Sequence, residues 1–140
     1  MQVMSDLSSD TPKALISGAT SGIGLALAQG FAAAGYDVVA VGLGALPQNT
    51  SRIRFVSLDV TNGPLVTEFV SDLDELDVVV NAAGIIRRED EFDPDVFAQV
   101  IDINLTGTMR LCTAARAALA TRGGSIINIA SMLSYFGGGN

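Results

Sequence analysis

The fold is decided by the stretch Ser17-Gly18-Ala19-Thr20-Ser21-Gly22-Ile23-Gly24, which follows the apolar residues 14–16 and precedes a segment of helical character over residues 25–34. This order predicts a strand, a glycine turn and a helix. Glycines let the backbone turn tightly beside a ligand, and the unpaired N–H groups of a first helical turn attract an anion such as a diphosphate. A glycine-rich turn without a ligand is the alternative, because one such motif is weak evidence.

The composition limits the class of protein. The hydrophobic content of 49% suits a domain with a core, and 140 residues are too few for two ordinary domains. A net charge of -7 argues against nucleic acid and anionic membranes as partners. Cys112 is the only cysteine, as is typical of a core residue in a reducing compartment. With a polar, acidic start and no apolar run of membrane length, the sequence predicts a cytoplasmic protein without a signal peptide.

Strand and helix patterns alternate after a flexible arm that we expect over residues 1–12. The expected strands are residues 13–17, 37–41, 53–58, 77–80 and 125–130, and the expected helices are residues 22–34, 64–73 and 93–121. Residues 42–52 are too few and too rich in Gly and Pro for a crossover helix. Right-handed connections then give an α/β fold, a Rossmann-like doubly wound parallel sheet of strand order 3-2-1-4-5.

Details of two helices follow from the same patterns. Thr61 or Asn62 is expected to cap the helix over residues 64–73. In the helix over residues 93–121 the apolar side chains recur near one face, which we expect to pack in the protein. These are Phe97, Ile101, Leu105, Thr108, Leu111, Cys112 and Ala115.

Glycine and polar residues gather at the predicted carboxyl ends of the strands. They are Gly18, Gly22 and Gly24 after the first strand, Asp59 after the third, residues 81–84 after the fourth and Ser131 after the fifth. Taken singly, Asp59 could be a helix cap, Asn81 a turn residue and Ser131 a loop hydroxyl. Parallel sheets bind ligands at the carboxyl ends of their strands, so together these residues predict a ligand site.

The set of motifs resembles the short-chain dehydrogenase/reductase family in its compact form. The resemblance rests on the G-x-x-x-G-x-G pattern of residues 18–24, Asp59-Val60, Asn81-Ala82-Ala83-Gly84, Asn104 and Ile129-Ala130-Ser131. It implies an NAD(P)-dependent oxidoreductase that interconverts a secondary alcohol and a ketone on a small polar substrate. In this family the nicotinamide supplies the hydride.

The resemblance also implies a role for each motif, with no metal. Residues Gly18, Ser21, Gly22, Ile23 and Gly24 would surround the diphosphate, Asp59 and Val60 would hold the adenine, and Asn81, Ala82, Ala83 and Gly84 would lie along the ribose. Asn104 would anchor a water of a proton relay. Ser131 would be catalytic by positioning the substrate oxygen, where a hydroxyl donor stabilises developing negative charge.

Residues 81–90 and 127–134 are similar to the sugar-acid branch of the family, the ketodeoxygluconate and gluconate dehydrogenases. Arg87 and Arg88 could then contact a substrate carboxylate, or they could belong to a solvated charged loop with Glu89 and Asp90. A dinucleotide-binding module without catalysis, such as a regulatory relative, and an acyl-carrier-protein ketoreductase are the alternative functions.

The sequence departs from the family at its catalytic Tyr and Lys. Tyr135 follows Ser131 by only four residues, and Lys13, the only lysine, precedes the first strand. We therefore expect the chain to be the N-terminal part of a longer enzyme, with residues 13–140 belonging to one NAD(P)-binding domain that stops before the sixth strand. These residues alone should be inactive, and residues 137–140 would begin a mobile active-site loop.

Cofactor choice and assembly are less marked in the sequence. At the end of the second strand an acidic side chain would favour NAD and an arginine NADP, but Gly42 and Leu43 stand there. Since no cation is placed there, and Arg52 and Arg54 lie too far along the chain, NAD is favoured.

Family members usually form homodimers or homotetramers by packing the helix over residues 93–121 against its copy. Small residues could allow this or face the sheet: Ala114, Ala115, Ala117 and Ala118.

Overall fold

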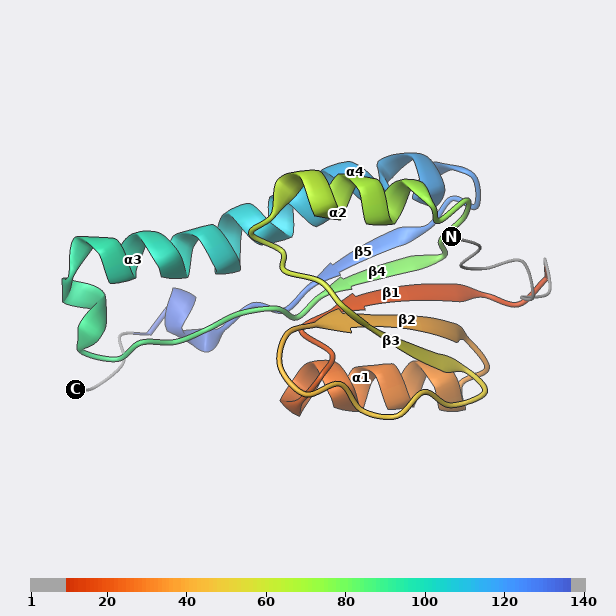
Figure 1. Cartoon of the computed structure of the whole chain (residues 1–140), viewed down its shortest axis with the longest axis horizontal. Coiled ribbons are helices and arrows are strands. Elements are labelled where there is room, and N and C mark those ends of the chain that lie inside the picture. Colours follow the sequence, from red (N-terminus) through yellow and green to blue (C-terminus); the bar gives the residue numbers. More distant parts are fainter. Residues whose placement is uncertain (1–9, 137–140) are drawn as a thin grey trace.

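The computed structural model describes residues 10–136 and places five parallel strands in one sheet of order β3-β2-β1-β4-β5 (Figure 1). The strands are β1 (Lys13–Ser17), β2 (Asp37–Gly42), β3 (Ile53–Ser57), β4 (Val78–Asn81) and β5 (Ser125–Asn128). In register, Ser17 at the end of β1 lies beside Val41 of β2 and Asn81 of β4. The predicted fold class and strand order are confirmed.

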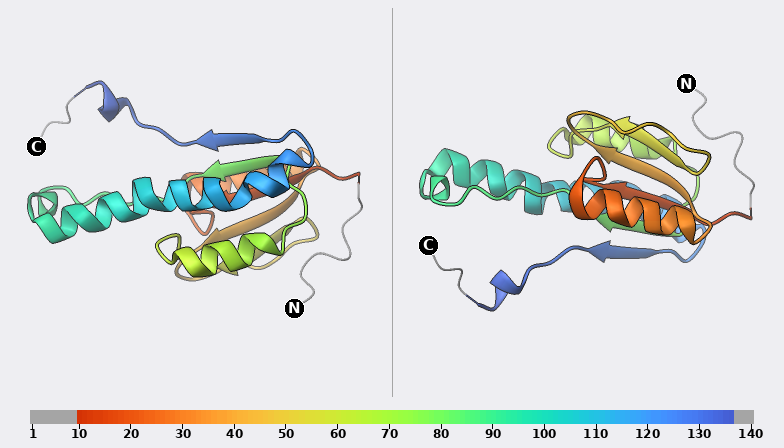
Figure 2. Two further views of the ribbon diagram at one scale, coloured as in Figure 1. Left: turned by 90° about the horizontal axis from the view of Figure 1, so that it is seen from above. Right: turned by 90° about the horizontal axis from the view of Figure 1, so that it is seen from below.

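Helices cover both faces of this sheet (Figures 1 and 2). On one face α1 (Gly22–Ala33) packs against β1, β2 and β3, and on the other α2 (Gly63–Ser71) packs beside α4 (Thr108–Ala120). Each face has its own apolar core, in which Ile16 and Phe55 lie under α1 on one face, while on the other Leu15 of the sheet shares a cluster with Val66 of α2 and Leu111 of α4. Residues 43–52, all described, form no helix, as predicted.

Local sequence explains where these helices begin and end. Of the two predicted caps for α2, Asn62 is the one used, because its Oδ1 accepts a hydrogen bond from the Leu65 N–H at 3.2 Å. Gly35 ends α1 with a φ of 95°, the left-handed conformation that favours glycine. Across this turn the ring of Phe31 in α1 packs edge to face against the ring of Tyr36, with centroids 5.0 Å apart.

The predicted continuous helix over residues 93–121 is wrong in its middle. It consists of α3 (Pro94–Ile101), the π-helical segment η2 (Asp102–Gly107) and α4. Leu111 and Ala115 are buried, but Phe97 and Leu105 are 54% and 63% exposed. The single apolar face is lost because α3 extends past the carboxyl ends of the strands, where its main contacts among the described elements are with its neighbours η1 and η2 and not with the sheet (Figure 1).

The alanines of α4 divide between the two alternatives. Ala115 and Ala118 are buried in the core and Ala114 packs against it, whereas Ala117 is exposed. At the edge of the sheet, β5 ends two residues earlier than predicted, at Asn128, and all of its residues are exposed. In the described part of the chain no helix has the length and apolarity needed to span a membrane.

Short 3-10 turns complete the described chain, η1 (Asp90–Phe92) before α3 and η3 (Met132–Ser134) after β5. Most of the predicted N-terminal arm, residues 1–9, and the predicted loop over residues 137–140 lie outside the described residues. Pro12, placed in the arm by the sequence, extends the pairing of β1 with β2 at their amino ends by accepting a hydrogen bond from the Asp37 N–H at 2.9 Å.

A network of charges joins the amino ends of β1 and β4 to the carboxyl end of α4. It lies at the opposite end of the strands from the predicted site. The Glu75 carboxylate accepts hydrogen bonds from Arg122 Nη2 and from Lys13 Nζ, each at 2.6 Å. Hydrogen bonds from Arg122 and then from Lys13 hold the pKa of Glu75 at about 2, well below the ordinary 4.5. The bond to Glu75 in turn raises the pKa of Arg122.

The pH dependence of stability should reveal this network. A lowered pKa means that the stabilisation by Glu75 is complete above pH 4.5 and is lost as the pH falls from 4.5 toward 2. We expect Glu75→Gln to be less stable than wild type at neutral pH and to lose less further stability over that range. Denaturant unfolding at a series of pH values measures this. Glu68→Gln, at an exposed site on α2, should keep the wild-type slope, and the same slope in Glu75→Gln would contradict the assignment.

Candidate functional site

A cavity of about 380 Å³ opens at the carboxyl ends of β1 to β4. Its wall includes the glycine turn after β1, Gly42 and Leu43 at the end of β2, residues 58–60 after β3, residues 82–85 after β4 and Ile103 of η2. The structure thus brings together every predicted cofactor-binding residue except Asn81. The position agrees with the expectation that ligands of such sheets bind at this edge.

The glycines of the first turn make close approaches that other residues would prevent. Gly18 has a φ of 65°, and a Cβ built on it would lie 2.6 Å from Ala82 O. A Cβ on Gly24 would overlap Gly18 O and lie 2.6 Å from Gly18 C. The turn therefore lies directly against the loop after β4, while the start of α1 faces the cavity with N–H groups that suit an anion.

Ser17 fixes one wall of the cavity, although it was not among the predicted site residues. Its side chain is buried at the end of β1, where Oγ accepts hydrogen bonds from the Ala82 and Ala83 N–H groups, each at 3.2 Å. Both alanines line the cavity. The signal that could have found Ser17 is a hydroxyl that ends a buried apolar strand just before the glycines.

Asp59 and Val60 form the wall after β3. The Asp59 carboxylate accepts from the Thr61 N–H at 2.9 Å and from Thr61 Oγ1 at 2.8 Å, so it closes a turn. It does not cap α2, because Asn62 does so. Both Asp59 and Val60 line the cavity, and only 7% of Val60 is exposed.

Asn81 lies outside the cavity lining. Its side chain is buried and donates from Nδ2 to Asn128 Oδ1 at 2.9 Å and to Cys112 Sγ at 3.2 Å. These bonds join the end of β4 to β5 and α4. Contact of Asn81 with a ribose remains a prediction, and the contact that the structure gives its side chain is with the protein.

The two predicted catalytic residues are placed differently. Asn104 lies in η2 and clasps the main chain of Ile85 in the cavity wall, accepting from its N–H at 2.8 Å and donating to its carbonyl oxygen at 2.9 Å. Ser131 is exposed and caps η3, accepting from the Leu133 N–H at 3.1 Å. It does not line the cavity, and the segment after β5 runs apart from η2 and α3 (Figure 2).

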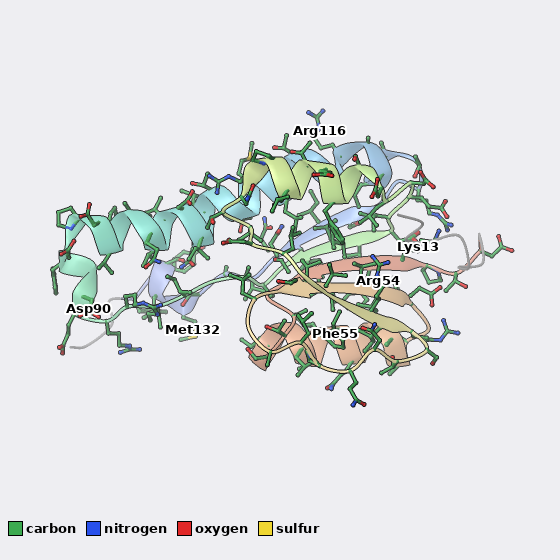
Figure 3. All side chains as sticks on the ribbon, in the orientation of Figure 1. Lys13, Arg54, Phe55, Asp90, Arg116 and Met132 are labelled. Carbon is green, nitrogen blue, oxygen red and sulfur yellow. The ribbon has the colours of Figure 1, made fainter. Side chains whose placement is uncertain are left out.

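The arginines considered from the sequence stand away from the cavity. Arg52 bonds Asp37 Oδ1 and Gly35 O, both at 3.1 Å, at the amino end of β2. Arg54 lies on β3, where burial lowers its pKa (Figure 3). Arg87 and Arg88 are exposed in the loop after β4 and do not line the cavity either. The described residues of the cavity lining include no Lys or Arg.

Comparison with known proteins gives the family. The model of the family described as short chain dehydrogenase matches residues 12–139. The chain belongs to the short-chain dehydrogenase family. It is 38% identical over 140 residues to 2-dehydro-3-deoxy-D-gluconate 5-dehydrogenase of Dickeya dadantii (strain 3937), covering 89% of this chain and 55% of the relative. The protein of the same name from Escherichia coli (strain K12) is 32% identical, covering 97% of this chain and 60% of the relative.

Solved structures agree with the family. An actinorhodin polyketide ketoreductase variant with NADPH superposes with a TM-score of 0.80 at 27% identity, covering 91% of this chain and 56% of that one. Another short-chain dehydrogenase/reductase family protein gives a TM-score of 0.77 at 34% identity, over 90% of this chain and 57% of that one. Our chain thus spans little more than half the length of each of these four related proteins.

Proposed function

We propose that the chain is the dinucleotide-binding part of an NAD(P)-dependent oxidoreductase that interconverts a secondary alcohol and a ketone. The observation that supports this most is the cavity, where the glycine turn, Asp59 and the loop after β4 converge. The residues present fit a dinucleotide, because Gly22 lines the cavity and a Cβ there would meet no protein atom within 4 Å, so it would fill space that is open to a ligand. When bound, the nicotinamide supplies the hydride.

The chain's own residues would bind and orient this group. Main-chain N–H groups at the start of α1 would hold the diphosphate, with Ser21 beside them, and Asp59 and Val60 would hold the adenine. Asn104 would keep a water for a proton relay, and Ser131 would donate a hydrogen bond to the substrate oxygen after the segment that follows β5 moves toward the cavity. A Tyr and a Lys from the rest of the enzyme would complete proton transfer, so residues 1–140 alone should turn over no substrate.

NAD is the proposed cofactor, because Thr20 and Leu43 form a neutral surface at the end of β2. The Thr20 hydroxyl donates to Leu43 O at 2.9 Å, and a Cβ on Gly42 would lie 3.0 Å from Thr20 Cγ2. A 2'-phosphate would find no cation in the cavity lining and would meet a chain of net charge -7.

Titration calorimetry of the chain with each nucleotide tests this proposal. We expect NAD to bind about tenfold or more tightly than NADP, which corresponds to a difference in binding free energy of at least about 1.4 kcal/mol. Leu43→Arg should narrow or reverse this ratio by placing a guanidinium at the end of β2. Tighter binding of NADP by the wild type would contradict the preference, and binding of neither nucleotide would contradict the proposed function.

A sugar acid is the proposed substrate. The relatives named above are called 2-dehydro-3-deoxy-D-gluconate 5-dehydrogenases, and the exposed guanidinium groups of Arg87 and Arg88, in the loop after β4, would bind the carboxylate of such a substrate. In the full-length enzyme, Arg87→Ala and Arg88→Ala should raise KM for sugar acids about tenfold or more while changing KM for neutral sugars little. Unchanged kinetics on both classes would remove both arginines from the substrate site.

The proposed assembly and cellular location are those expected for a member of this family. Exposed apolar side chains on α3 and η2, including Phe97 and Leu105, would pack against a second copy and give a homodimer or homotetramer in the cytoplasm. Sedimentation of the full-length enzyme measures its state, and a monomer at micromolar concentration would contradict this assembly.

A further inference from the structure

Two walls of the cavity, from segments far apart in the sequence, meet at Val60 and Gly107. Val60 follows β3 and lines the cavity, while Gly107 ends η2, the π-helical segment that also carries Ile103 and Asn104. A Cβ built on Gly107 would lie 2.7 Å from Val60 Cγ2 and 3.1 Å from Val60 Cβ. Only a glycine therefore lets the Val60 side chain come this close to η2.

Arg110 joins the same two walls by its guanidinium. Its Nη2 pairs with Asp102 Oδ1 at 2.8 Å, while its Nη1 lies 3.4 Å from Val60 O and 3.5 Å from Asp102 O. The stem of Arg110 passes over Gly63, where a Cβ would lie 3.6 Å from Nε. Arg110 thus reaches from α4 to both the start of η2 and the main chain after β3.

The exposure of this pair suggests that its effect is on position more than on stability. The side chains of Arg110 and Asp102 are 28% and 41% exposed, and ion pairs that are partly in water contribute little to folding. A π-helical turn is a rare conformation that often marks a functional site and needs support from its surroundings. The pair supplies such support at the amino end of η2, and the contact of Val60 with Gly107 supplies it at the other end.

The position of Asn104 depends on this segment. Asn104 lies between Asp102 and Gly107 and holds the main chain of Ile85 by two hydrogen bonds. A shift of η2 relative to Val60 would therefore move the Asn104 side chain and the wall at Ile85 together.

We propose that Arg110, paired with Asp102, is a positioning residue that clamps the wall at Val60 onto the π-helical segment and so sets Asn104 relative to a bound nucleotide. This rests on the proposed dinucleotide site, in which Val60 meets the base. Through this clamp, a nucleotide base bound at Val60 would order the wall at Ile85, although the base itself takes no part in hydride transfer.

Binding of 5'-AMP, which would fill only the base end, tests the clamp on the whole 140-residue chain. We expect Arg110→Gln and Asp102→Asn each to weaken AMP and NAD binding about threefold to tenfold, in the range of measured couplings through packed networks. Arg110→Lys should bind AMP more tightly than Arg110→Gln because it keeps a cation opposite Asp102. Arg116→Gln changes an exposed arginine of the same helix that points outward, and it should bind like the wild type (Figure 3).

Hydrogen exchange at the Ile85 amide, which donates to Asn104, separates positioning from general stability. In the wild type AMP should slow exchange of this amide, and in Arg110→Gln this slowing should be lost while exchange of core amides such as Leu15 stays unchanged. If the wild type binds AMP and Arg110→Gln binds it equally, or if AMP still slows exchange at Ile85 in the variant, the clamp is disproved. If the wild type binds neither AMP nor NAD, the proposed function fails first.

Discussion

Gly24→Ala is expected to abolish measurable NAD binding and to lower the free energy of unfolding by about 3 kcal/mol, at the upper end of the usual cost of overpacking. The added methyl group would overlap Gly18 O and would lie 2.6 Å from Gly18 C and 3.0 Å from Ala19 Cα. All three atoms belong to the backbone, so no side chain can turn aside. The first turn would have to open, and Gly18 would leave its contact with the loop after β4. Calorimetric titration and denaturant unfolding measure the two effects.

Gly30→Ala is the matched control, because Gly30 lies in the same helix and a Cβ there would meet no atom within 4 Å. Alanine should raise the free energy of unfolding by about 0.5–1 kcal/mol at this exposed helical position and leave NAD binding unchanged. If Gly24→Ala bound NAD with wild-type affinity, the close approach within the turn would be unnecessary for the site. The pair separates loss of glycine as such from loss of this contact.

The layout of the fold was predictable because it depends on patterns that are local in sequence. Continuous apolar runs gave β2 and β4, the glycines gave the turn before α1, and the rules for right-handed crossovers gave the strand order. The cavity followed from topology, since residues 18–24, 59–60 and 82–84 had to meet at one edge of the sheet. The absence of a helix between β2 and β3 could also be predicted, because the connection over residues 42–52 is short and rich in Gly and Pro.

Other features depend on which side chains meet across the fold. The π-helical turn at η2 has no periodicity of its own, so residues 93–121 were predicted as one helix. Asn81 has the sequence context of a ligand contact, but its amide finds Asn128 and Cys112 on neighbouring elements. The exposure of Phe97 was not predicted, because the apolar periodicity of a helix indicates which face is apolar but not whether another element of the same chain packs against it.

Ser17→Ala should show how strongly the first and fourth strands hold the cavity together. The substitution removes the Oγ that accepts from the Ala82 and Ala83 N–H groups in a place where Ser17 is only 1% exposed. Each donor left without a partner costs about 1–3 kcal/mol, and the loop that they belong to forms the wall of the cavity. We therefore expect a large loss of stability and an NAD affinity at least about tenfold weaker, because part of the binding free energy must reorder the wall.

Two further substitutions make this result specific to the hydroxyl. Ser17→Thr keeps an oxygen at the same place and is β-branched, which suits a strand, so it should retain most of the stability and the NAD affinity. Ser57→Ala removes an exposed hydroxyl at the end of β3 and should change neither. Chemical denaturation and NAD titration of all three variants decide the matter. If Ser17→Ala matched Ser57→Ala in both measurements, water or a shifted main chain would be replacing Oγ, and the wall would owe its position to the glycine turn alone.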